Sequence, residues 1–519
     1  MIAIVKSTAL HGLDGQVVEV EVDVSNGLPS FDIVGLPDAS VRESKDRVRA
    51  AIKNSGLEFP VKRITVNLAP ADLKKEGPIY DLPIAVGILA ATAQLTPEQY
   101  GRFAYLGELS LNGSLRSVAG ALPNVLAAVG ASMNEIIVPR ENAAEAALVE
   151  GAAIFPAGSL AELTGFLRGE NEIAPYVLDL AGYMSSAGAD WPDFTDVKGQ
   201  HTARRSLEVA AAGSHNLIMF GSPGSGKTML ARRLPGILPD MTFQESIETT
   251  KIYSLAGLLT PDIPLVTRRP FRAPHHTAST IGIVGGGRIP RPGEISLAHH
   301  GILFLDEMPE FQKDALEALR QPLEDGVVTI SRATISLTYP ARLMLVGALN
   351  PCPCGYLGDT LRECVCTPHQ VQRYISRLSG PLLDRIDICI EVPRLPYEEI
   401  NSGRKPESSS SIKKRVEAAR ERQRKRFRDE AQRNARSQAP TCNARMGPKE
   451  VRRLCKMTKG ARALFQSAFK KLALSARSHD KILKVSRTIA DLEGSELINE
   501  SHLAEAIQYR SLDRIYSYY

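Results

Sequence analysis

The chain has 519 residues and a formal net charge of +5, with 43% hydrophobic and 23% charged residues. These proportions exclude a disordered or fibrous protein. The length exceeds the roughly 250–300 residues that one hydrophobic core can organise, so we expect about three domains. The N-terminal residues turn polar too early for a signal peptide, and no apolar run approaches the ~20 residues of a membrane span. We therefore predict a cytoplasmic protein without membrane partners.

The first part of the chain has the pattern of a mixed α/β domain. Residues 16–22 and 64–68 alternate apolar and polar side chains as strands do, and short helical patterns lie between such runs. We assign this domain to residues 1–168. Residues 169–198 have little periodicity and a turn-forming cluster near their end, which predicts a linker.

The middle and the end of the chain differ in pattern. Residues 199–396 repeat strands and helices in an order typical of a parallel nucleotide-binding sheet. In the connector at 397–446, the stretch 413–436 holds eleven Lys or Arg residues against four Asp or Glu. We expect a solvated helix there, with nucleic-acid contact as the alternative. Helical spacing returns over 447–519 and predicts a small all-helical domain.

A complete phosphate-binding motif follows the apolar run at 216–220. It consists of Gly221, Ser222, Pro223, Gly224, Ser225, Gly226, Lys227 and Thr228. Its glycines let backbone N–H groups turn inward around phosphates, and a helix follows the loop. Lys227 would reach the β- and γ-phosphates, and Thr228 would ligate Mg²⁺. The motif predicts an ATP site.

Two further apolar runs end in polar residues that suit ATP hydrolysis. Residues 302–305 lead into Asp306 and Glu307, as a buried parallel strand should when it delivers carboxylates at its carboxyl end. Asp306 would hold Mg²⁺ through water, and Glu307 would act as general base on the attacking water. Residues 343–349 end at Asn350, whose amide would orient that water. This resembles the first sensor of AAA+ motors.

Arg385 completes the predicted hydrolysis site. Its surroundings, residues 382–387, resemble the arginine-finger segment of AAA+ motors, so Arg385 would act on the ATP of a neighbouring subunit. A structural salt bridge with Asp384 or Asp387 is the alternative. If Arg385 is a finger, the monomer is inactive and a ring is required.

Two basic segments are candidates for DNA contact. Residues 282–292 are rich in glycine and carry Arg288 and Arg291, which could pair with DNA phosphates. A predicted hairpin at 327–337 offers Arg332 at its turn. In related motors such loops project into the central pore. Solvated surface charges or intersubunit ion pairs remain the alternative for each arginine.

Four cysteines form two Cys-x-Cys pairs. Cys352 and Cys354 are separated from Cys364 and Cys366 by nine residues, and together they supply enough sulfur for a tetrahedral zinc site. Typical zinc pairs have roughly two to four residues between ligands, so buried thiols and a redox disulfide stay open. The paired histidines at 275–276 and 299–300 lack carboxylates at zinc-enzyme spacing, which favours structural or phosphate-adjacent roles.

The whole chain resembles the magnesium-chelatase-like AAA+ family known as YifB or ComM. The matching segments are 199–200, 210–217, 271–276, 291–298, 350–355 and 379–385. The resemblance implies a homohexameric ring that encircles DNA, uses ATP and Mg²⁺, and acts as a branch-migration helicase in recombination during natural transformation. Recombination proteins are then candidate partners. By the same resemblance, Arg477 would be the second sensor and reach ATP from the helical lid.

The N-terminal domain is similar to the proteolytic domain of Lon-type proteases. The similarity lies in residues 75–78, 107–113 and 127–142. Lon chemistry needs a serine after Gly-Pro and a lysine in the later glycine-containing turn. Here Ile79 and Tyr80 follow Gly-Pro, and residues 121–124 contain no lysine. We expect an inactive protease fold that serves oligomerisation or DNA binding.

The function that this pattern favours is an ATP hydrolase that translocates on DNA. A chelatase-type motor that remodels a protein partner is the nearest rival, because its ATPase core uses the same parts. A nucleotide-switched DNA-binding scaffold that never translocates is a third interpretation.

Overall fold

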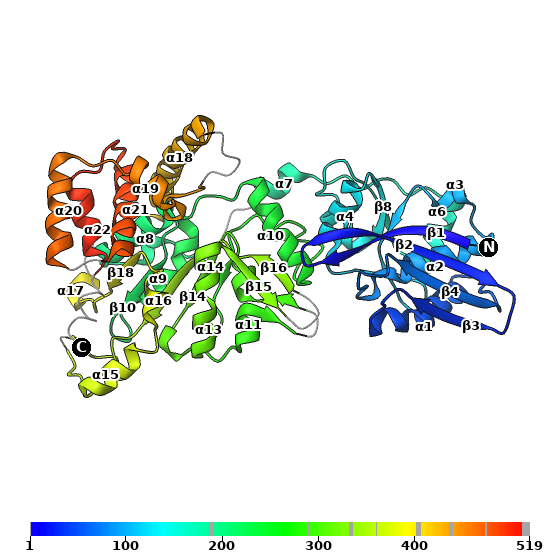
Figure 1. Cartoon of the computed structure of the whole chain (residues 1–519), viewed down its shortest axis with the longest axis horizontal. Helices are drawn as coiled ribbons and strands as arrows, with labels where there is room; N and C mark the ends of the chain where they lie inside the picture. Colours follow the sequence, from blue (N-terminus) through cyan, green and yellow to red (C-terminus); the bar gives the residue numbers. More distant parts are fainter. Residues whose placement is uncertain are drawn as a thin grey trace. The chain divides into compact units, whose positions relative to one another are not determined.

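A computed structural model describes residues 2–185, 191–287, 290–331, 336–359, 361–400, 406–434, 440–472 and 475–510 (Figure 1). These residues form two compact units. The first consists of the described residues of Met1–Ala187, Thr242–Thr267 and Ala333–Tyr339, and the second of those of Gly188–Met241, Arg268–Arg332 and Pro340–Tyr519. Within these ranges, none of the helices is long and apolar enough to cross a membrane.

The first unit is built on a seven-stranded mixed sheet, in the order β3-β4-β2-β1-β5-β8-β9. Its strands are β1 (Ile2–His11), β2 (Asp14–Ser25), β3 (Ser30–Val34), β4 (Arg63–Ala69), β5 (Ala104–Tyr105), β8 (Glu135–Pro139) and β9 (Ala153–Ala157). The predicted strands at 16–22 and 64–68 lie in β2 and β4, which pair antiparallel with Val20 opposite Leu68. Their alternation buries Val18, Val20 and Val22 completely.

Helices and short strands complete the first unit. They are α1 (Ala39–Asn54), η1 (Pro78–Tyr80), α2 (Asp81–Ala91), α3 (Pro97–Tyr100), β6 (Glu108–Leu109), β7 (Leu115–Arg116), α4 (Ala121–Gly130), η2 (Arg140–Asn142), α5 (Ala143–Ala146), α6 (Leu160–Arg168), α7 (Leu180–Ser185) and α10 (Phe243–Leu255). At the positions compared with Lon, Ile79 and Tyr80 are buried in η1. In α4, the buried Asn124 accepts a hydrogen bond from Thr8 Oγ1 at 2.8 Å.

Helix α10 belongs to the first unit although our sequence interpretation put it within the ATPase core. The backbone N–H of Gly120 donates to Ser254 O at 3.0 Å, and Ser254 Oγ donates to the Glu145 carboxylate. Gly120 has φ +79, and a Cβ there would come within 2.6 Å of Leu10. Burial raises the pKa of Glu145, against the hydrogen bonds that it accepts. These contacts fix α10 on α4 and α5.

The second unit contains a five-stranded sheet, in the order β11-β14-β17-β10-β18. Its strands are β10 (Leu217–Phe220), β11 (Phe271–Arg272), β14 (Ile302–Leu305), β17 (Met344–Leu349) and β18 (Ile388–Glu391). All neighbouring strands run parallel, which confirms the predicted parallel sheet. The sheet therefore delivers the residues after β10, β14 and β17 to one edge.

The remaining elements of the second unit are mostly helical. They are η3 (Phe194–Asp196), α8 (His201–Gly213), α9 (Lys227–Arg233), η4 (Leu234–Ile237), α11 (Thr280–Val284), β12 (Gly285–Gly286), β13 (Arg291–Pro292), α12 (Glu294–Leu297), η5 (Met308–Glu310), α13 (Lys313–Ala318), α14 (Arg320–Asp325), α15 (Pro368–Ile375), α16 (Gly380–Leu383), α17 (Tyr397–Ile400), α18 (Ser409–Asn434), η6 (Asn443–Arg445), α19 (Pro448–Leu454), α20 (Lys459–Lys471), α21 (Ala476–Glu493) and α22 (Glu500–Gln508). Strand β15 (Val327–Ser331) also belongs to the second unit, whereas all but the last residue of β16 (Ser336–Pro340) belongs to the first. The helices from α19 to α22 confirm the predicted helical C-terminal region.

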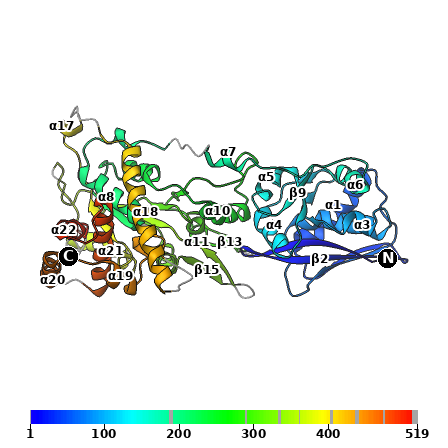
Figure 2. The same ribbon diagram turned by 90° about the horizontal axis from the view of Figure 1, so that it is seen from above.

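Helix α18 corrects one expectation. We expected a solvated helix at 413–436, but one face of α18 is buried against α8 and α21 (Figure 2). Its buried residues are Ser409, Ile412, Val416, Ala419, Gln423 and Phe427, spaced three or four apart. The expectation was wrong because this apolar stripe is narrow and lies within a run of charges that dominates the composition.

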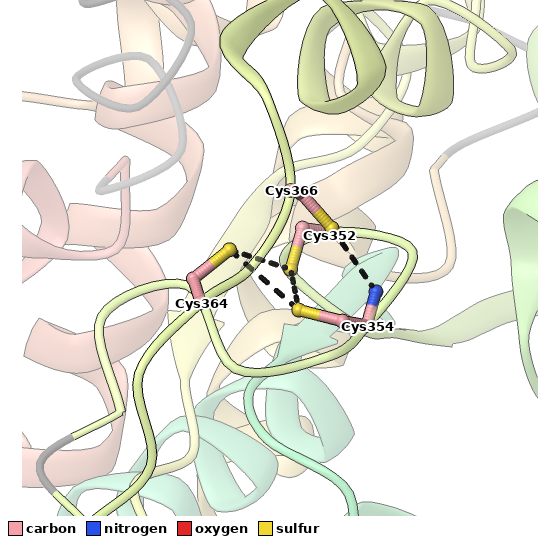
Figure 3. A group of neighbouring side chains, drawn as sticks. All are labelled: Cys352, Cys354, Cys364 and Cys366. Atoms are coloured by element: carbon pink, nitrogen blue, oxygen red, sulfur yellow. Dashed lines mark hydrogen bonds between the residues drawn. The ribbon is translucent and has the colours of Figure 1, made fainter.

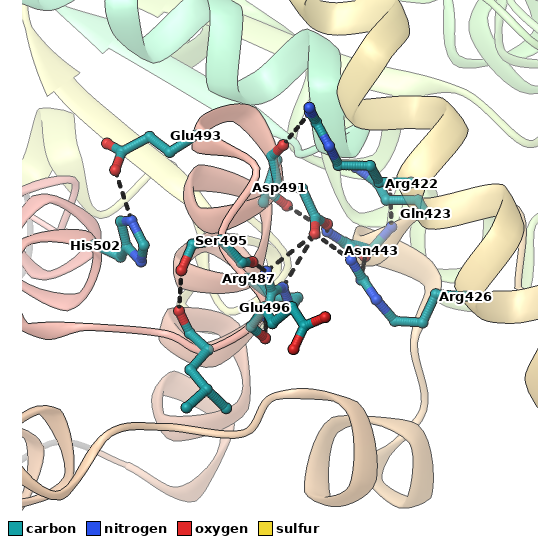
Figure 4. A network of polar contacts seen from close by, with 12 residues as sticks. Arg422, Gln423, Arg426, Asn443, Arg487, Asp491, Glu493, Ser495, Glu496 and His502 are labelled. Carbon is teal, nitrogen blue, oxygen red and sulfur yellow. Dashed lines mark hydrogen bonds and ion pairs between the residues drawn. The ribbon is translucent and has the colours of Figure 1, made fainter.

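A polar network also ties α18 to α21 (Figure 4). Arg426 and Arg487 both contact Oδ1 of Asp491, the latter through Nε at 3.2 Å. Asn443 Nδ2 donates to Asp491 Oδ2 at 2.8 Å. Arg487 is only 2% exposed, and its guanidinium also donates to the backbone carbonyls of Ser495 and Glu496. Part of the positive charge of α18 therefore holds the C-terminal helices to the core.

Candidate ATP hydrolysis site

The phosphate-binding motif forms a loop between β10 and α9. Gly224 has φ +79 and Gly226 has φ +95, in the left-handed region that favours glycine. A Cβ at Gly221 would lie 2.2 Å from the Val392 carbonyl oxygen, so this position requires glycine because the two backbones are in close contact. The loop thus has the shape that a phosphate cradle needs.

Lys227 lies folded against its own loop. Its Nζ donates to Gly221 O at 2.7 Å and to Ser222 O at 3.1 Å, and it also lies 3.3 Å from Asn350 Oδ1. Burial lowers the pKa of Lys227 to about 8, although the nearby charges of Asp306 and Glu307 oppose that shift. The ammonium is therefore poised beside the predicted sensor amide.

The two residues predicted to serve Mg²⁺ are in direct contact. Thr228 Oγ1 donates to Asp306 Oδ2 at 2.7 Å, and the backbone N–H of Glu307 donates to Asp306 Oδ1 at 3.0 Å. A hydroxyl and a carboxylate at the mouth of a phosphate cradle are the oxygen ligands that Mg²⁺ prefers. These residues fit the ion.

Glu307 stands apart from this pair. Its backbone adopts φ +50, and its side chain is 53% exposed. One carboxylate oxygen lies 3.3 Å from Nδ1 of His276. The two carboxylates therefore have different side-chain partners, His276 for Glu307 and Thr228 for Asp306.

Three further residues contact the ATP site, and our sequence analysis had considered only His276 among them, as a packing or phosphate-adjacent residue. His276 approaches Glu307, Gln200 Nε2 donates to Ser225 O at 3.2 Å, and Arg394 donates to Pro223 O at 3.1 Å. The signal for His276 was available, because it follows β11, and β11 pairs in parallel with the strand that carries Asp306 and Glu307. Gln200 and Arg394 are distant in sequence from the loop, and no local pattern indicates their contacts.

The structure places Arg385 and Arg477 together, away from the phosphate loop. Arg385 pairs with Glu324, whereas the alternative partner Asp384 accepts from Arg477 at 3.1 Å. Both arginines line a pocket of about 580 Å³, and no residue of 221–228 is part of its lining. Arg477 thus lies beside the finger candidate rather than beside Lys227 of the same chain.

The predicted DNA contacts are described only in part. Arg291 is exposed on β13, which pairs antiparallel with β12 so that Arg291 lies opposite Gly286. A Cβ at Gly285 would come within 2.4 Å of the Arg291 carbonyl oxygen, so the two strands need glycine at this position. Arg288 and Arg332 lie outside the described residues.

The four clustered cysteines converge in space (Figure 3). Their sulfur atoms all lie within 4.8 Å of one another. The Sγ atom of Cys352 is 3.3 Å from that of Cys354 and 3.6 Å from that of Cys364, and the backbone N–H of Cys354 donates to Cys366 Sγ at 3.4 Å. None of the four is in a disulfide.

The five-stranded parallel sheet carries a phosphate loop, a Thr–Asp pair, a separate glutamate and an asparagine at the end of a strand. This arrangement defines a P-loop ATPase of the AAA+ class. Family models named "Magnesium chelatase, subunit ChlI", "Subunit ChlI of Mg-chelatase" and "Magnesium chelatase, subunit ChlI C-terminal" match residues 193–400, 20–142 and 406–510. The chain is 46% identical to competence protein ComM of Haemophilus influenzae, over 99% of this chain and 98% of that one.

Other relatives agree with this assignment. YifB of Escherichia coli is 45% identical over 99% of this chain and 98% of its own length. The magnesium-chelatase 67 kDa subunit of Chlorobaculum parvum is 27% identical over 30% of this chain and 23% of its own length. The chain belongs to the magnesium-chelatase-like AAA+ family that includes the ComM and YifB proteins. Proteins of this class use ATP as substrate and Mg²⁺ as cofactor, and the site has residues that fit both.

Proposed function

We propose that this protein is an ATP-driven DNA translocase that promotes branch migration during recombination, acting in the cytoplasm as a homohexameric ring. The observation that supports it most is the full-length similarity to a protein named for competence, joined to a complete set of hydrolysis residues. Competence is the capacity of a cell to take up DNA, so DNA is the expected substrate of a motor that serves it. Recombination proteins are candidate partners.

The hydrolysis step follows from the positions of the side chains. On ATP binding, Lys227 would exchange the carbonyl oxygens of Gly221 and Ser222 for phosphate oxygens. Mg²⁺ held by Thr228 and Asp306 would neutralise charge on the β- and γ-phosphates. Glu307 would take the proton of the attacking water.

Asn350 would orient that water against the γ-phosphate, since its amide already lies beside the Lys227 ammonium. His276 would position the Glu307 carboxylate, 3.3 Å from its ring. Before ATP binds, the contact with His276 gives the Glu307 carboxylate a partner within the protein.

The location of two arginines supports the proposed ring. Arg385 and Arg477 share a pocket that does not include the phosphate loop of their own chain. Both would therefore serve the ATP of a neighbouring subunit, where positive charge stabilises the transition state. Asn216 Nδ2 donates to the Arg385 carbonyl oxygen at 3.0 Å, which holds the Arg385 backbone beside the start of β10.

DNA would pass the hairpin formed by β12 and β13. Arg291 is exposed there and could pair with a phosphate oxygen. Arg288 and Arg332 are further candidates on sequence grounds. Such contacts carry no base specificity, as a translocase requires.

Branch migration on four-way DNA tests the proposal. Wild-type protein should migrate branches with ATP and Mg²⁺, whereas Lys227→Ala and Glu307→Gln should not, and DNA should stimulate wild-type ATPase activity. Normal branch migration by correctly folded Lys227→Ala protein would refute a motor. DNA binding without any migration by the wild type would favour the nucleotide-switched scaffold.

A chelatase-like motor is the second candidate, because all three matching family models describe a magnesium-chelatase subunit. Such a motor would remodel a protein partner rather than DNA. ATPase activity that no form of DNA changes, together with no branch migration, would favour it.

A further inference from the structure

The cysteine loop, residues 352–366, begins two residues after Asn350 of the ATP site. Strand β17 ends at Leu349, Asn350 follows it, and Cys352 comes two residues later. Cys352 is fully buried against Val371, Tyr374 and Ile375 on α15. The sensor amide and the first cysteine thus share one short stretch of backbone.

The cysteine loop also lies against the phosphate loop. Gly355 has φ +84, and a Cβ there would lie 2.6 Å from Cδ of Pro223, so the Gly355 backbone packs closely against the Pro223 ring. Ser222 lies close enough to Asp359 to lower the pKa of that carboxyl group. Two of the residues that shape the phosphate loop therefore have the cysteine loop as their support.

Apart from its packing on α15, the cysteine loop is held by local contacts such as the hydrogen bond from Arg362 to the Tyr356 hydroxyl at 3.0 Å. No helix or strand lies among its described residues, which are all but residue 360. Leu357 and the cysteines pack in a small cluster against α15, whereas Leu361 is 75% exposed and Val365 is 84% exposed. A bound metal ion would further restrict the conformations of such an irregular loop.

The sulfur geometry suits one metal ion. A tetrahedral zinc site with Zn–S bonds of about 2.3 Å separates its sulfurs by about 3.8 Å. Three of the six pairs here are 3.3, 3.6 and 3.6 Å apart, and none exceeds 4.8 Å. A disulfide would need about 2.05 Å. Four thiolates favour Zn²⁺ over Mg²⁺, which prefers oxygen ligands.

We infer that Cys352, Cys354, Cys364 and Cys366 bind one structural Zn²⁺, and that the closed loop braces the phosphate loop through Gly355 and Asp359. Loss of zinc would release this support and weaken nucleotide binding. The second half of the inference rests on the proposed ATP site.

Metal analysis of the full-length protein, purified without chelator, tests the site itself. We expect about one equivalent of zinc per chain, and background zinc in the Cys364→Ser/Cys366→Ser variant. The control is Cys455→Ala, because Cys455 is buried in the same unit but outside the cluster, and it should keep its zinc. Wild-type zinc below about a tenth of an equivalent would overturn the site.

A reversible experiment on wild-type protein tests the brace. Binding of a fluorescent ATP analogue is measured on the zinc-loaded protein, after zinc removal by a chelator, and after Zn²⁺ is returned. We expect binding to weaken about tenfold without zinc and to recover with it, while circular dichroism shows that the fold persists. Unchanged binding by zinc-free protein would overturn the brace.

Asp359→Ala separates the two halves of the inference. This variant should keep its zinc and still bind the analogue several-fold more weakly. If it binds as tightly as the wild type, Asp359 carries no support to Ser222 and that part of the brace is wrong. A zinc-loaded wild type that binds no ATP analogue would overturn the proposed ATP site, and the brace with it, but would leave the metal site supported.

Discussion

Thr228 and Asp306 are joined by a 2.7 Å hydrogen bond between the start of α9 and the end of β14. The hydroxyl and the carboxylate that should share Mg²⁺ are therefore in place before the ion binds. The contact also links the phosphate loop to the central strands of the sheet, since β14 pairs with β17.

Asp306→Asn should raise the Mg²⁺ requirement. The amide keeps an oxygen for Thr228 but loses the negative charge, so the Mg²⁺ concentration for half-maximal ATPase activity should rise about 10–100-fold. Glu307→Gln is the control. It should lower turnover by roughly 10²–10⁴-fold and leave the Mg²⁺ requirement unchanged. Wild-type Mg²⁺ dependence in Asp306→Asn would argue against its role at the ion.

The affinity for ATP should fall at alkaline pH because of Lys227. Its pKa in the free protein is about 8, whereas a bound phosphate favours the charged ammonium. Below pH 8 the affinity should be level, and above it the Kd should rise by up to about tenfold per pH unit. The measurement is analogue binding from pH 7 to 10. Lys227→Arg stays charged, so any binding that it retains should not show this rise.

Mixing experiments can decide where Arg477 acts. Arg385→Ala and Lys227→Ala should each lose ATPase activity, by about 10³-fold or more for the finger. A mixture of the two should regain part of it, because some interfaces then join an intact phosphate loop to an intact pocket.

Arg477→Ala should behave like Arg385→Ala, because both residues line one pocket. It should therefore be rescued by Lys227→Ala subunits and not by Arg385→Ala subunits. The reverse pattern, rescue by Arg385→Ala alone, would show that Arg477 reaches the ATP of its own chain, as the sequence comparison suggested.

His215→Ala should destabilise the second unit. The buried imidazole lies 3.1 Å from Asp387 through Nδ1 and 2.8 Å from the Thr488 hydroxyl through Nε2. Without it, Asp387 loses its main hydrogen-bond partner while buried, at about 3–5 kcal/mol. Thr488→Val removes only the weaker contact and should lose about 1 kcal/mol. Thermal unfolding of both variants tests whether His215→Ala loses more stability than Thr488→Val. Equal losses of stability would contradict this expectation.

The sequence predicted those site residues that lie in one local motif or directly after one strand. Gly221 to Thr228 form a local motif, and Asp306, Glu307 and Asn350 each follow an apolar run. The parallel sheet then brings them to one edge. The C-terminal helices were predictable from their spacing for the same local reason.

Contacts between distant segments could not be predicted in this way. The approach of Arg394 to Pro223 spans 171 residues, and the pairing of Arg477 with Asp384 spans 93. Each depends on how complete elements pack, which no local pattern records. The buried face of α18 was missed for a different reason, since its few apolar residues are hidden in composition by the charges around them.

The position of α10 has a consequence for how the protein is made. The first unit includes Thr242–Thr267, so the ribosome must synthesise the phosphate loop at 221–228 before the N-terminal unit can be completed. Until then, the Glu145 carboxylate and the Gly120 N–H lack the hydrogen bonds that Ser254 provides in the folded unit. Exchange of N-terminal domains between relatives at a single junction near residue 188 would pair α4 and α5 with a foreign α10. Selection should therefore act on these segments jointly, despite the hundred or so residues that separate them.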